Sequence, residues 1–468
     1  MAELSVHSAP ATVPLTAGAP ADPAAAVDER ALEEVVRFTS DLIRIDTTNR
    51  GGGDGNERPA AEYVAERLAD AGLEPLVLES APGRANVVAR IPGTDPTADA
   101  LLVHGHLDVV PAEAADWTVP PFSGEIRDGV VWGRGAIDMK NMDAMVLATV
   151  RAWARSGARP ARDIVLAFTA DEEDSATYGS GYLVEEHAAL FDGCTEGISE
   201  SGAYTFHSGD LRIYPVAAGE RGTAWLKLTA RGRAGHGSKV NHDNAVSHLA
   251  AAVTRIGEHR WPVRITDTVR AALTELAALH GVAADLDDVD ALLEKLGAAA
   301  TLVRPTVRNS ANPTMLQAGY KLNVIPGSAT AYVDGRVLPG GEEEFTTTMD
   351  RLTGPDVSWE YHHREVPLQA PVDSPAYAAM REALEHFDPR AHVVPYCMSG
   401  GTDAKQFSRL GITGYGFSPL DLPPGFDHQA LFHGVDERVP VEALHFGVRV
   451  LDRFLRGGGA AHDEGTRR

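Results

Sequence analysis

The spacing of apolar residues from Asp28 onward alternates between helical and strand patterns. Apolar residues between 32 and 43 recur near helical spacing, and those between 61 and 73 repeat the pattern. Short apolar runs predict strands over 86–91, 101–103 and 164–168, and helices over 142–154 and 181–187. Because strands alternate with helices, this part of the chain predicts an α/β fold with a mostly parallel, helix-covered sheet.

The pattern changes after about Leu211. Half-exposed strands are predicted over 225–230 and 329–337, with a helix over 244–256, which suits a smaller α+β unit with its own antiparallel sheet. The first pattern then resumes with a helix over 374–386, where Ser374 is the expected N-cap, a strand over 411–417 and a closing helix over 441–455.

These changes predict one catalytic domain that is interrupted by an insert. We expect the catalytic domain to comprise 28–214 and 367–456, and the insert over 215–366 to be a lid or dimerisation domain. Residues 1–27 are expected to form a disordered leader, and 457–468 a flexible tail. Within the insert, the mostly helical segment 265–303 has two open uses. We favour a thickening of the dimer domain over a lengthened wall on the acyl side of the site.

Composition narrows the class of protein. The 468 residues suffice for two domains, and 44% hydrophobic with 23% charged residues is ordinary for a globular chain. A net charge of −24 without a basic patch argues against nucleic acid as a partner. No apolar run is long enough to span a membrane. Two distant cysteines cannot build a disulfide framework, and the leader lacks the features of a secretory signal, so we expect a cytoplasmic location.

Imidazole and carboxylate side chains recur where predicted elements end. His106 and Asp108 follow the strand 101–103, and three successive acids at 171–173 follow the strand 164–168. His-x-Asp alone is more often a surface turn, and the glycine-flanked Asp138 alone is more often a helix cap. Three acids stacked at a strand end repel one another unless a cation compensates them. With Glu200 and His433, the pattern favours a divalent metal, Zn²⁺ first and Mn²⁺ or Co²⁺ as alternatives.

At this point the chain resembles a known family. The ordered blocks are HGHLDVVPA, WTVPPFSG, GRGAIDMK, ADEE, ISESG, AGHGS, NVIPG, SGGTDA and FHGVDER. In this order they look like the M20 metallopeptidases, which include carboxypeptidases, dipeptidases, aminoacylase-1 and succinyl-diaminopimelate desuccinylase. The resemblance covers nearly all of residues 28–456, and its strength lies in nine blocks in sequence.

The resemblance implies a role for each matching residue and two bound divalent ions. His106 and Glu200 would hold one ion, Glu173 and His433 would hold the other, and Asp138 would bridge them. Glu172 would be the general base that takes a proton from a metal-activated water. Asp108 would orient His106 through its carboxylate.

The insert is expected to contribute to the same reaction. His236 in AGHGS resembles the family's oxyanion-stabilising histidine, which often reaches the partner subunit's site, so a homodimer is expected. Asn323 and Arg336 resemble substrate-contacting positions, although Arg336 could instead form a structural ion pair with Asp334. A backbone pocket near the substrate carboxylate is expected from Gly400, Gly401 and Thr402. His104, His242, His362 and His363 are interpreted as turn or surface histidines, and Cys397 as a packed core residue.

The sequence therefore predicts a dinuclear hydrolase for a small-molecule substrate. We expect it to cleave the amide bond of a small peptide or N-acyl amino acid with a free carboxylate, in the manner of a di- or carboxypeptidase. An aminoacylase of the same family is the close alternative. A different class is an inactive metal-binding or interaction protein on the same fold. The full set of expected site residues argues against that class.

Overall fold

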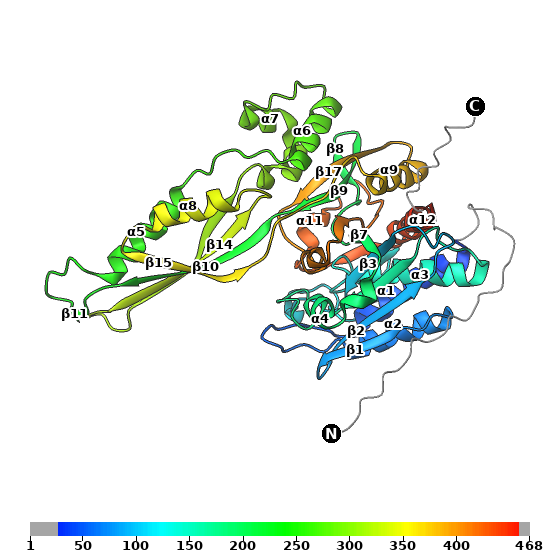
Figure 1. Ribbon diagram of the computed structural model, residues 1–468, viewed down its shortest axis with the longest axis horizontal. Coiled ribbons are helices and arrows are strands. Elements are labelled where there is room, and N and C mark those ends of the chain that lie inside the picture. Colours follow the sequence, from blue (N-terminus) through cyan, green and yellow to red (C-terminus); the bar gives the residue numbers. More distant parts are fainter. Residues whose placement is uncertain (1–26, 458–468) are drawn as a thin grey trace.

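The computed structural model describes residues 27–457, so nearly all of the predicted leader and tail lies outside the described residues. Figure 1 shows a helix-covered sheet at one end of the molecule and a narrower sheet that projects from it. The mixed α/β architecture that the hydrophobic pattern predicts is confirmed, with parallel strands at the centre of the large sheet.

The large sheet has ten strands, and its central strands β6, β3, β7 and β18 are parallel. The edges add antiparallel pairs on both sides. The strands along its main path are β1 (Leu76–Ala81), β2 (Arg84–Ile91), β6 (Ile164–Thr169), β3 (Ala100–His106), β7 (Cys194–Ser199), β18 (Thr413–Gly416), β9 (Leu211–Glu220) and β16 (Leu368–Gln369). Two further strands, β17 (Ala391–Met398) and β8 (Phe206–Ser208), pair with β9.

Helices cover both faces of this sheet, as the alternating strand residues require. In β3, Leu101 and Val103 belong to one apolar core, whereas Leu102 between them belongs to another. The first face carries α1 (Glu29–Arg44), α2 (Arg58–Asp70), α3 (Lys140–Ser156), α9 (Pro375–Phe387) and α12 (Val441–Gly457). The second face carries α4 (Ser180–Glu186) and α10 (Ala404–Phe407). The Ser374 side chain caps α9 as expected.

The second sheet has four antiparallel strands. Its order is β12 (Ser310–Ala318), β14 (Ser328–Val337), β10 (Gly222–Arg231) and β15 (Val357–Arg364), and α5 (Ala245–Glu258) and α8 (Glu342–Thr353) pack on it. We call this unit the lid. At its far end, β11 (Gly235–His236) pairs with β13 (Val324–Ile325) (Figure 1). A small sheet of β19 (Arg438–Pro440), β5 (Val130–Trp132) and β4 (Glu125–Arg127) flanks the large one.

Two features differ from the expected insert over 215–366. Residue 215 falls inside β9, which stays in the large sheet through Glu220. The segment with α6 (Asp267–Leu279) and α7 (Val289–Leu296) packs on β9 and β17, in a core separate from that of the lid. We therefore propose that the lid comprises about 222–264 and 307–366, and that the helical segment belongs with the catalytic domain.

None of the helices within residues 27–457 combines the length and apolar character needed to cross a bilayer.

Candidate metal centre

The ends of three neighbouring parallel strands bring the candidate ligands together. β6, β3 and β7 lie side by side, and their carboxyl ends lead to Glu172 and Glu173, to His106 and to Glu200 respectively. The carboxyl edge of a parallel sheet is where α/β folds place their sites, because chain segments diverge there. Asp138 and His433 reach the same place from loops.

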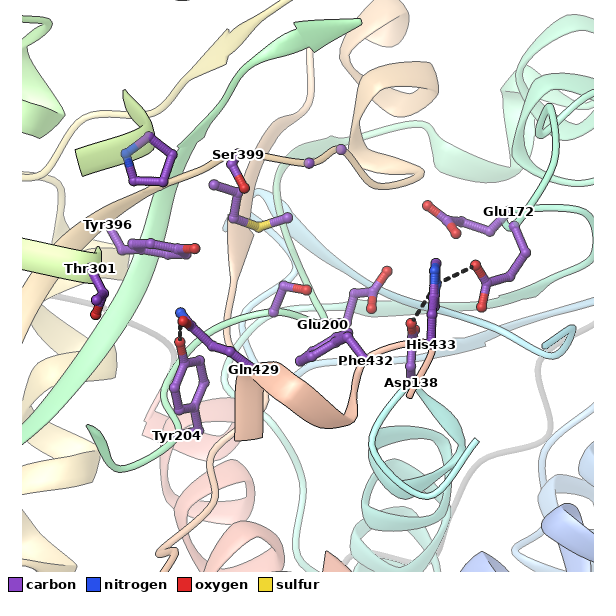
Figure 2. Close-up of a pocket in the computed structure, with 16 residues that line it drawn as sticks. Asp138, Glu172, Glu200, Tyr204, Thr301, Tyr396, Ser399, Gln429, Phe432 and His433 are labelled. Carbon is purple, nitrogen blue, oxygen red and sulfur yellow. Dashed lines mark hydrogen bonds and ion pairs between the residues drawn. The ribbon is translucent and has the colours of Figure 1, made fainter. Parts of the chain in front are cut away.

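Asp138 lies between two groups of ligand atoms. Its Oδ1 lies 3.1 Å from His106 Nε2, and its Oδ2 lies 3.2 Å from His433 Nε2. Glu200 completes the first group, with Oε1 3.6 Å from His106 Nε2. Glu173 completes the second, with Oε2 3.0 Å from His433 Nε2. Figure 2 shows His433 beside Asp138. In each group of three, the ligand atoms lie within 4.8 Å of one another.

The electrostatics of this cluster are those of acids crowded away from water. Burial, reinforced by the charge of Asp138, raises the pKa of Glu173 to about 7 and that of Glu200 to about 8. Hydrogen bonds to Asp138 and Glu173 raise the pKa of His433 to about 10. Although burial opposes it, contacts with His106 and His433 lower the pKa of Asp138. The cluster therefore retains protons at neutral pH that divalent cations would displace.

Glu172 lies beside the ligands without joining either group. Its Oε2 is 3.9 Å from His106 Nε2, and it lines a cavity of about 410 Å³ together with Asp138, Glu173, Glu200 and His433. Burial raises its pKa well above the ordinary value, and the charges of Glu200 and Glu173 add to the rise, against the opposing charge of His106. Its place and its raised pKa are those of a carboxylate suited to accept a proton.

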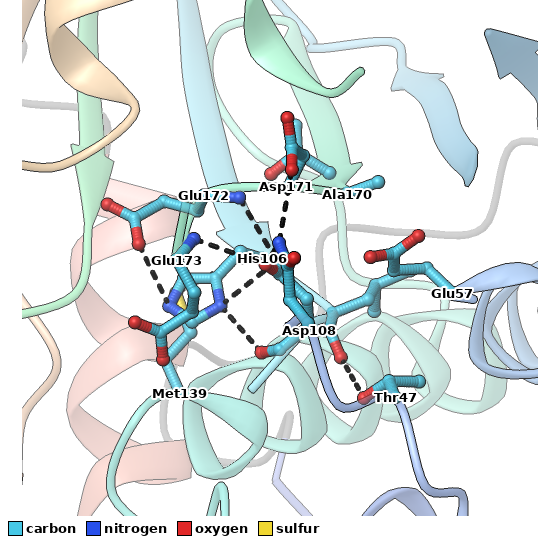
Figure 3. Close-up of polar contacts among 12 residues, drawn as sticks. Thr47, Glu57, His106, Asp108, Met139, Ala170, Asp171, Glu172 and Glu173 are labelled. Carbon is cyan, nitrogen blue, oxygen red and sulfur yellow. Dashed lines mark hydrogen bonds and ion pairs between the residues drawn. The ribbon is translucent and has the colours of Figure 1, made fainter. Parts of the chain in front are cut away.

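Asp108 is buried next to His106, but its contacts differ from the expected ones. His106 Nδ1 lies 3.0 Å from the backbone carbonyl oxygen of Asp108 and 3.7 Å from its carboxylate. The carboxylate instead accepts the backbone N–H groups of Glu172 and Glu173, each at 3.1 Å (Figure 3). Asp108 thus fixes the His106 ring through its carbonyl and the turn that carries the two glutamates through its carboxylate.

Sequence reasoning missed the buried polar groups behind this turn. Asn49 donates to both Asp108 and Asp171, at 2.9 and 3.0 Å, and Arg84 donates to Asp171 at 2.9 Å. Asp171, the first of the three acids at 171–173, therefore holds the turn in place through its hydrogen bonds to Asn49 and Arg84. The sequence shows that Asp171 belongs to the acidic triplet, but it does not show the distant residues that Asp171 binds.

Glu437 performs a similar task for the loop that carries Asp138. Its Oε1 accepts the backbone N–H groups of Ile137 and Asp138 at 2.7 and 3.0 Å. Its Oε2 accepts the backbone N–H of Gly135 at 3.0 Å and a guanidinium N–H of Arg134 at 2.8 Å. Its position after His433 in FHGVDER was the one available signal.

The three site residues that were expected from the lid lie away from the candidate metal ligands. His236 is exposed in β11 at the far end of the lid, and the carbonyl of Asn323 accepts the N–H of Gly237 beside it (Figure 1). Arg336 in β14 donates to Asp334 at 2.8 Å, so the ion pair weighed from the sequence is present. Within one described chain, none of these three residues lines the cavity that holds the acids.

The glycine block is split in its contacts. Gly400 and Gly401 line the cavity, whereas Thr402 is buried and donates to Glu220 through its N–H at 3.1 Å and its hydroxyl at 2.7 Å. A Cβ on Gly401 would overlap Lys405 Nζ, so a side chain there would displace that lysine.

The remaining histidines and cysteines are mostly as expected. His242 and His362 are exposed and His363 is half-buried, but His104 is only 3% exposed. It is buried because β3 continues to His106 rather than ending at 103. Cys397 and Cys194 are both free and buried, and Cys397 belongs to the core beneath α6.

Comparisons with known proteins place the chain in a family. The model of peptidase family M20/M25/M40 matches residues 102–457. The N-fatty-acyl-amino acid synthase/hydrolase PM20D1 of Xenopus tropicalis is 27% identical, over 92% of this chain and 86% of that protein. Aminoacylase-1 of Sus scrofa is 28% identical, over 85% and 89%. The metallo-carboxypeptidase Sso-CP2 from Sulfolobus solfataricus superposes with a TM-score of 0.67 and 17% identity, over 91% of this chain and 99% of that one.

Proposed function

The chain belongs to peptidase family M20/M25/M40, and on that premise we propose that it is a metal-dependent amidohydrolase of N-acyl amino acids or small peptides. The observation that carries the proposal is the position of Asp138. Its two oxygens face His106 and His433 separately, each within a group of three ligand atoms. A carboxylate shared in this way suits two cations bound side by side.

The donors present fit two divalent ions. One ion would take His106, Asp138 and Glu200, and the other Asp138, Glu173 and His433. Glu173 Oε1 is buried without a hydrogen-bond partner among the described residues, which is an acceptor that a cation would satisfy. Mixed nitrogen and oxygen donors suit Zn²⁺, with Co²⁺ or Mn²⁺ as alternatives. Bound there, the ions would lower the pKa of water and polarise the substrate carbonyl.

Glu172 is the residue to which we assign proton transfer. Its carboxylate lines the cavity, and Glu172 is not one of the five candidate ligand residues. Burial raises the pKa of this carboxyl, which suits it to take the proton of the attacking water. It can then deliver that proton to the departing amine nitrogen. The backbone N–H groups of Glu172 and Glu173 donate to Asp108, and these hydrogen bonds keep the Glu172 carboxylate beside the ligands.

For the substrate, we propose an N-acyl amino acid ahead of a peptide. The relatives that match over most of their length are named as an N-fatty-acyl-amino acid synthase/hydrolase and an aminoacylase. The free carboxylate would meet the Gly400–Gly401 end of the cavity. Arg336 is already paired with Asp334, so it could serve the substrate only by sharing or exchanging that partner.

We further propose that the enzyme works as a homodimer. His236 and Asn323 lie together at the exposed far end of the lid, so they can act on a reaction only at another chain's site or after a large movement. Mixing Glu172→Ala protomers with His236→Ala protomers should restore part of the activity, because each hybrid dimer holds one intact composite site. If subunits demonstrably exchange and no activity returns, action of His236 on a partner subunit is excluded.

The free, buried state of both cysteines supports the cytoplasmic location that we propose. The reaction itself is tested by screening Zn²⁺-loaded protein against N-acyl amino acids, dipeptides and their carboxyl-blocked forms by mass spectrometry. We expect hydrolysis of the unblocked N-acyl amino acids, and a loss of about 10²–10⁴-fold in kcat for Glu172→Ala. Unchanged rates in Glu172→Ala would point instead to an inactive binding protein. Equal rates on blocked substrates would exclude the free-carboxylate requirement.

A further inference from the structure

We propose that residues 267–306, which we call the acyl wall, make this enzyme selective for substrates with a long, apolar acyl group. A second cavity behind the acyl wall would receive the distal end of that group. The inference rests on the proposed amidohydrolase function and concerns its specificity.

The acyl wall is fixed to the catalytic sheet. Val269, Leu273 and Leu276 of α6 share a core with Ile213 of β9 and Val394 of β17. Polar contacts reinforce this attachment, since Thr268 donates to the carbonyl of Ala218 at 3.1 Å and Arg381 of α9 donates to Glu275 at 3.2 Å. The α7 helix leads into two short 3₁₀ turns, Gly297–Leu302 and Arg304–Thr306. These turns are therefore held at the mouth of the site rather than at a distant interface.

The 410 Å³ cavity has two chemically different ends. Asp138, Glu200, His433 and Glu172 lie at one end, and Thr301, Tyr396 and Tyr204 lie at the other (Figure 2). Its remaining uncharged lining includes Pro305, Met398 and Phe432. Thr301 and Pro305 come from the acyl wall. An apolar group attached to the scissile carbonyl can extend toward this end without meeting a charge.

A second cavity of about 450 Å³ adjoins the first. Tyr204, Thr301 and Gln429 line both, so they form the partition between them. The partition is light, because Gln429 donates one hydrogen bond of 3.0 Å to the Tyr204 hydroxyl. Ala298 of the acyl wall lines only the second cavity, and so do Phe206 and Phe426.

The polar side chains of the second cavity are largely engaged within the chain. His207 contacts the Leu422 carbonyl at 2.8 Å, and Asp427 accepts the N–H of Ala430 at 3.1 Å as the cap of α11 (His428–Leu431). Burial lowers the pKa of His428 to about 3, so this imidazole is uncharged. Tyr204 stacks on His428 at 4.0 Å between ring centroids. The apolar surface that remains for a ligand comes from the rings of Tyr204, Phe206 and Phe426 and from the methyl group of Ala298.

This surface favours an acyl chain over a longer peptide. A peptide would bring an ammonium group and several amide groups, each of which loses hydrogen bonds to water unless the wall replaces them. The one carboxylate in the second cavity, Asp427, already caps a helix. A hydrocarbon chain needs no such partners and gains free energy with each methylene that it buries.

The test uses substitutions that fill each cavity in turn. Thr301→Trp would narrow the passage between the cavities, and Ala298→Trp would fill only the second. Thr274→Trp is the matched control, because Thr274 is exposed on α6 of the same segment and lines neither cavity. Each variant is loaded with Zn²⁺ and assayed on N-acyl derivatives of the amino acid that the substrate screen selects, with acyl chains of two, eight, twelve and sixteen carbons. Binding of cis-parinaric acid, a fluorescent long-chain acid, is measured in parallel.

In the wild-type enzyme, kcat/KM should rise with chain length. Thr301→Trp should lower the ratio of the twelve-carbon to the two-carbon rate by about tenfold or more, since each methylene left in water forfeits a factor of about four. Ala298→Trp should spare the eight-carbon substrate and penalise the sixteen-carbon one. Both variants should weaken cis-parinaric acid binding, and Thr274→Trp should change neither readout.

Two results would overturn the inference. One is a chain-length profile that is flat or falling in the wild type, and the other is a profile that Thr301→Trp and Ala298→Trp leave unchanged. In either case hydrolysis of the two-carbon substrates would keep the proposed function intact. If no acyl chain length is hydrolysed by the Zn²⁺-loaded wild type, the proposed function itself fails.

Discussion

At the scale of single residues, neighbours in sequence are given different tasks by their partners. Asp171, Glu172 and Glu173 are consecutive acids, yet Asp171 binds Arg84 and Asn49, Glu172 faces the cavity, and Glu173 contacts His433. The difference arises from the turn after β6, whose N–H groups are held by Asp108. The positions of Glu172 and Glu173 therefore depend on Asp108, whose carboxylate binds their backbone N–H groups.

Glu437 gives the sharpest test of such support. Both of its oxygens accept N–H groups around the Asp138 loop. In Glu437→Gln, an amide NH₂ group would replace one of these oxygens, and because NH₂ is itself a donor it cannot accept those hydrogen bonds. Because Asp138 would lose its fixed orientation, we expect Zn²⁺ affinity to fall by roughly 10–100-fold.

Isothermal titration of the metal-stripped protein with Zn²⁺, in competition with a chelator, measures this loss. Glu442→Gln is the matched control, since the Glu442 side chain is 88% exposed at the start of α12. Wild-type affinity in Glu437→Gln, with a wild-type circular dichroism spectrum, would show that the loop needs no such support.

The sequence revealed the residues of the centre better than it revealed their supports. His106, Glu173 and Glu200 could be predicted because each follows an apolar run, and parallel strands end at a common edge. The roles of Glu437 and Asn49 could not, because their partners are separated from them by about 300 and by 59 or more positions in the chain. Such contacts depend on the packed fold and leave no local pattern.

At the scale of elements, the strands and helices of the large sheet were readable because burial imposes a period. The predicted helix 142–154 is α3 at Lys140–Ser156, and the predicted strand 164–168 is β6 at Ile164–Thr169. For the helical segment 265–303 we expected a thickening of the dimer domain, whereas its helices pack on the catalytic sheet. An amphipathic helix shows that it packs, but its sequence does not show on which core, and α6 packs on β17 rather than in the lid.

Element ends also explain why the lid and the catalytic unit separate where they do. β9 remains in the large sheet up to Glu220, and β10 of the lid begins two residues later at Gly222. A Cβ on Gly222 would lie 2.6 Å from the Glu365 carbonyl, where the chain returns from the lid. The two chain segments that connect the sheets therefore pack side by side. Hydrophobic periodicity in the sequence cannot predict this contact.

At the scale of the whole molecule, the two chain segments that cross between the sheets are joined by an ion pair between buried Lys405 and half-buried Glu365. Lys405 of α10, only 3% exposed, donates to Glu365 at 2.8 Å. Thr223 of the lid strand β10 donates to the same carboxylate oxygen at 2.8 Å. The contact therefore joins the catalytic unit to both lid crossings, next to the glycines that line the cavity.

The pKa of Glu365 makes the strength of the ion pair with Lys405 depend on pH. Burial alone would raise that pKa, but the hydrogen bond with His363, the charge of Lys405 and the hydrogen bonds from Lys405 and Thr223 lower it to about 2. Because the folded-state pKa lies below the unfolded value of 4.5, the stabilisation is complete above pH 4.5 and is lost as the pH falls toward 2.

We therefore expect Glu365→Gln to lower the free energy of unfolding by about 1–3 kcal/mol at pH 7, because it leaves the Lys405 charge buried without its partner. Urea unfolding at pH 7, 5 and 3.5 should show a deficit that is constant between the first two values and smaller at the third. Glu360→Gln is the control, since Glu360 lies in the same strand β15 but its side chain is 70% exposed beside Lys227. A deficit that persists unchanged at pH 3.5 would mean that the lost packing of Glu365, and not its charge, holds the lid to the catalytic sheet.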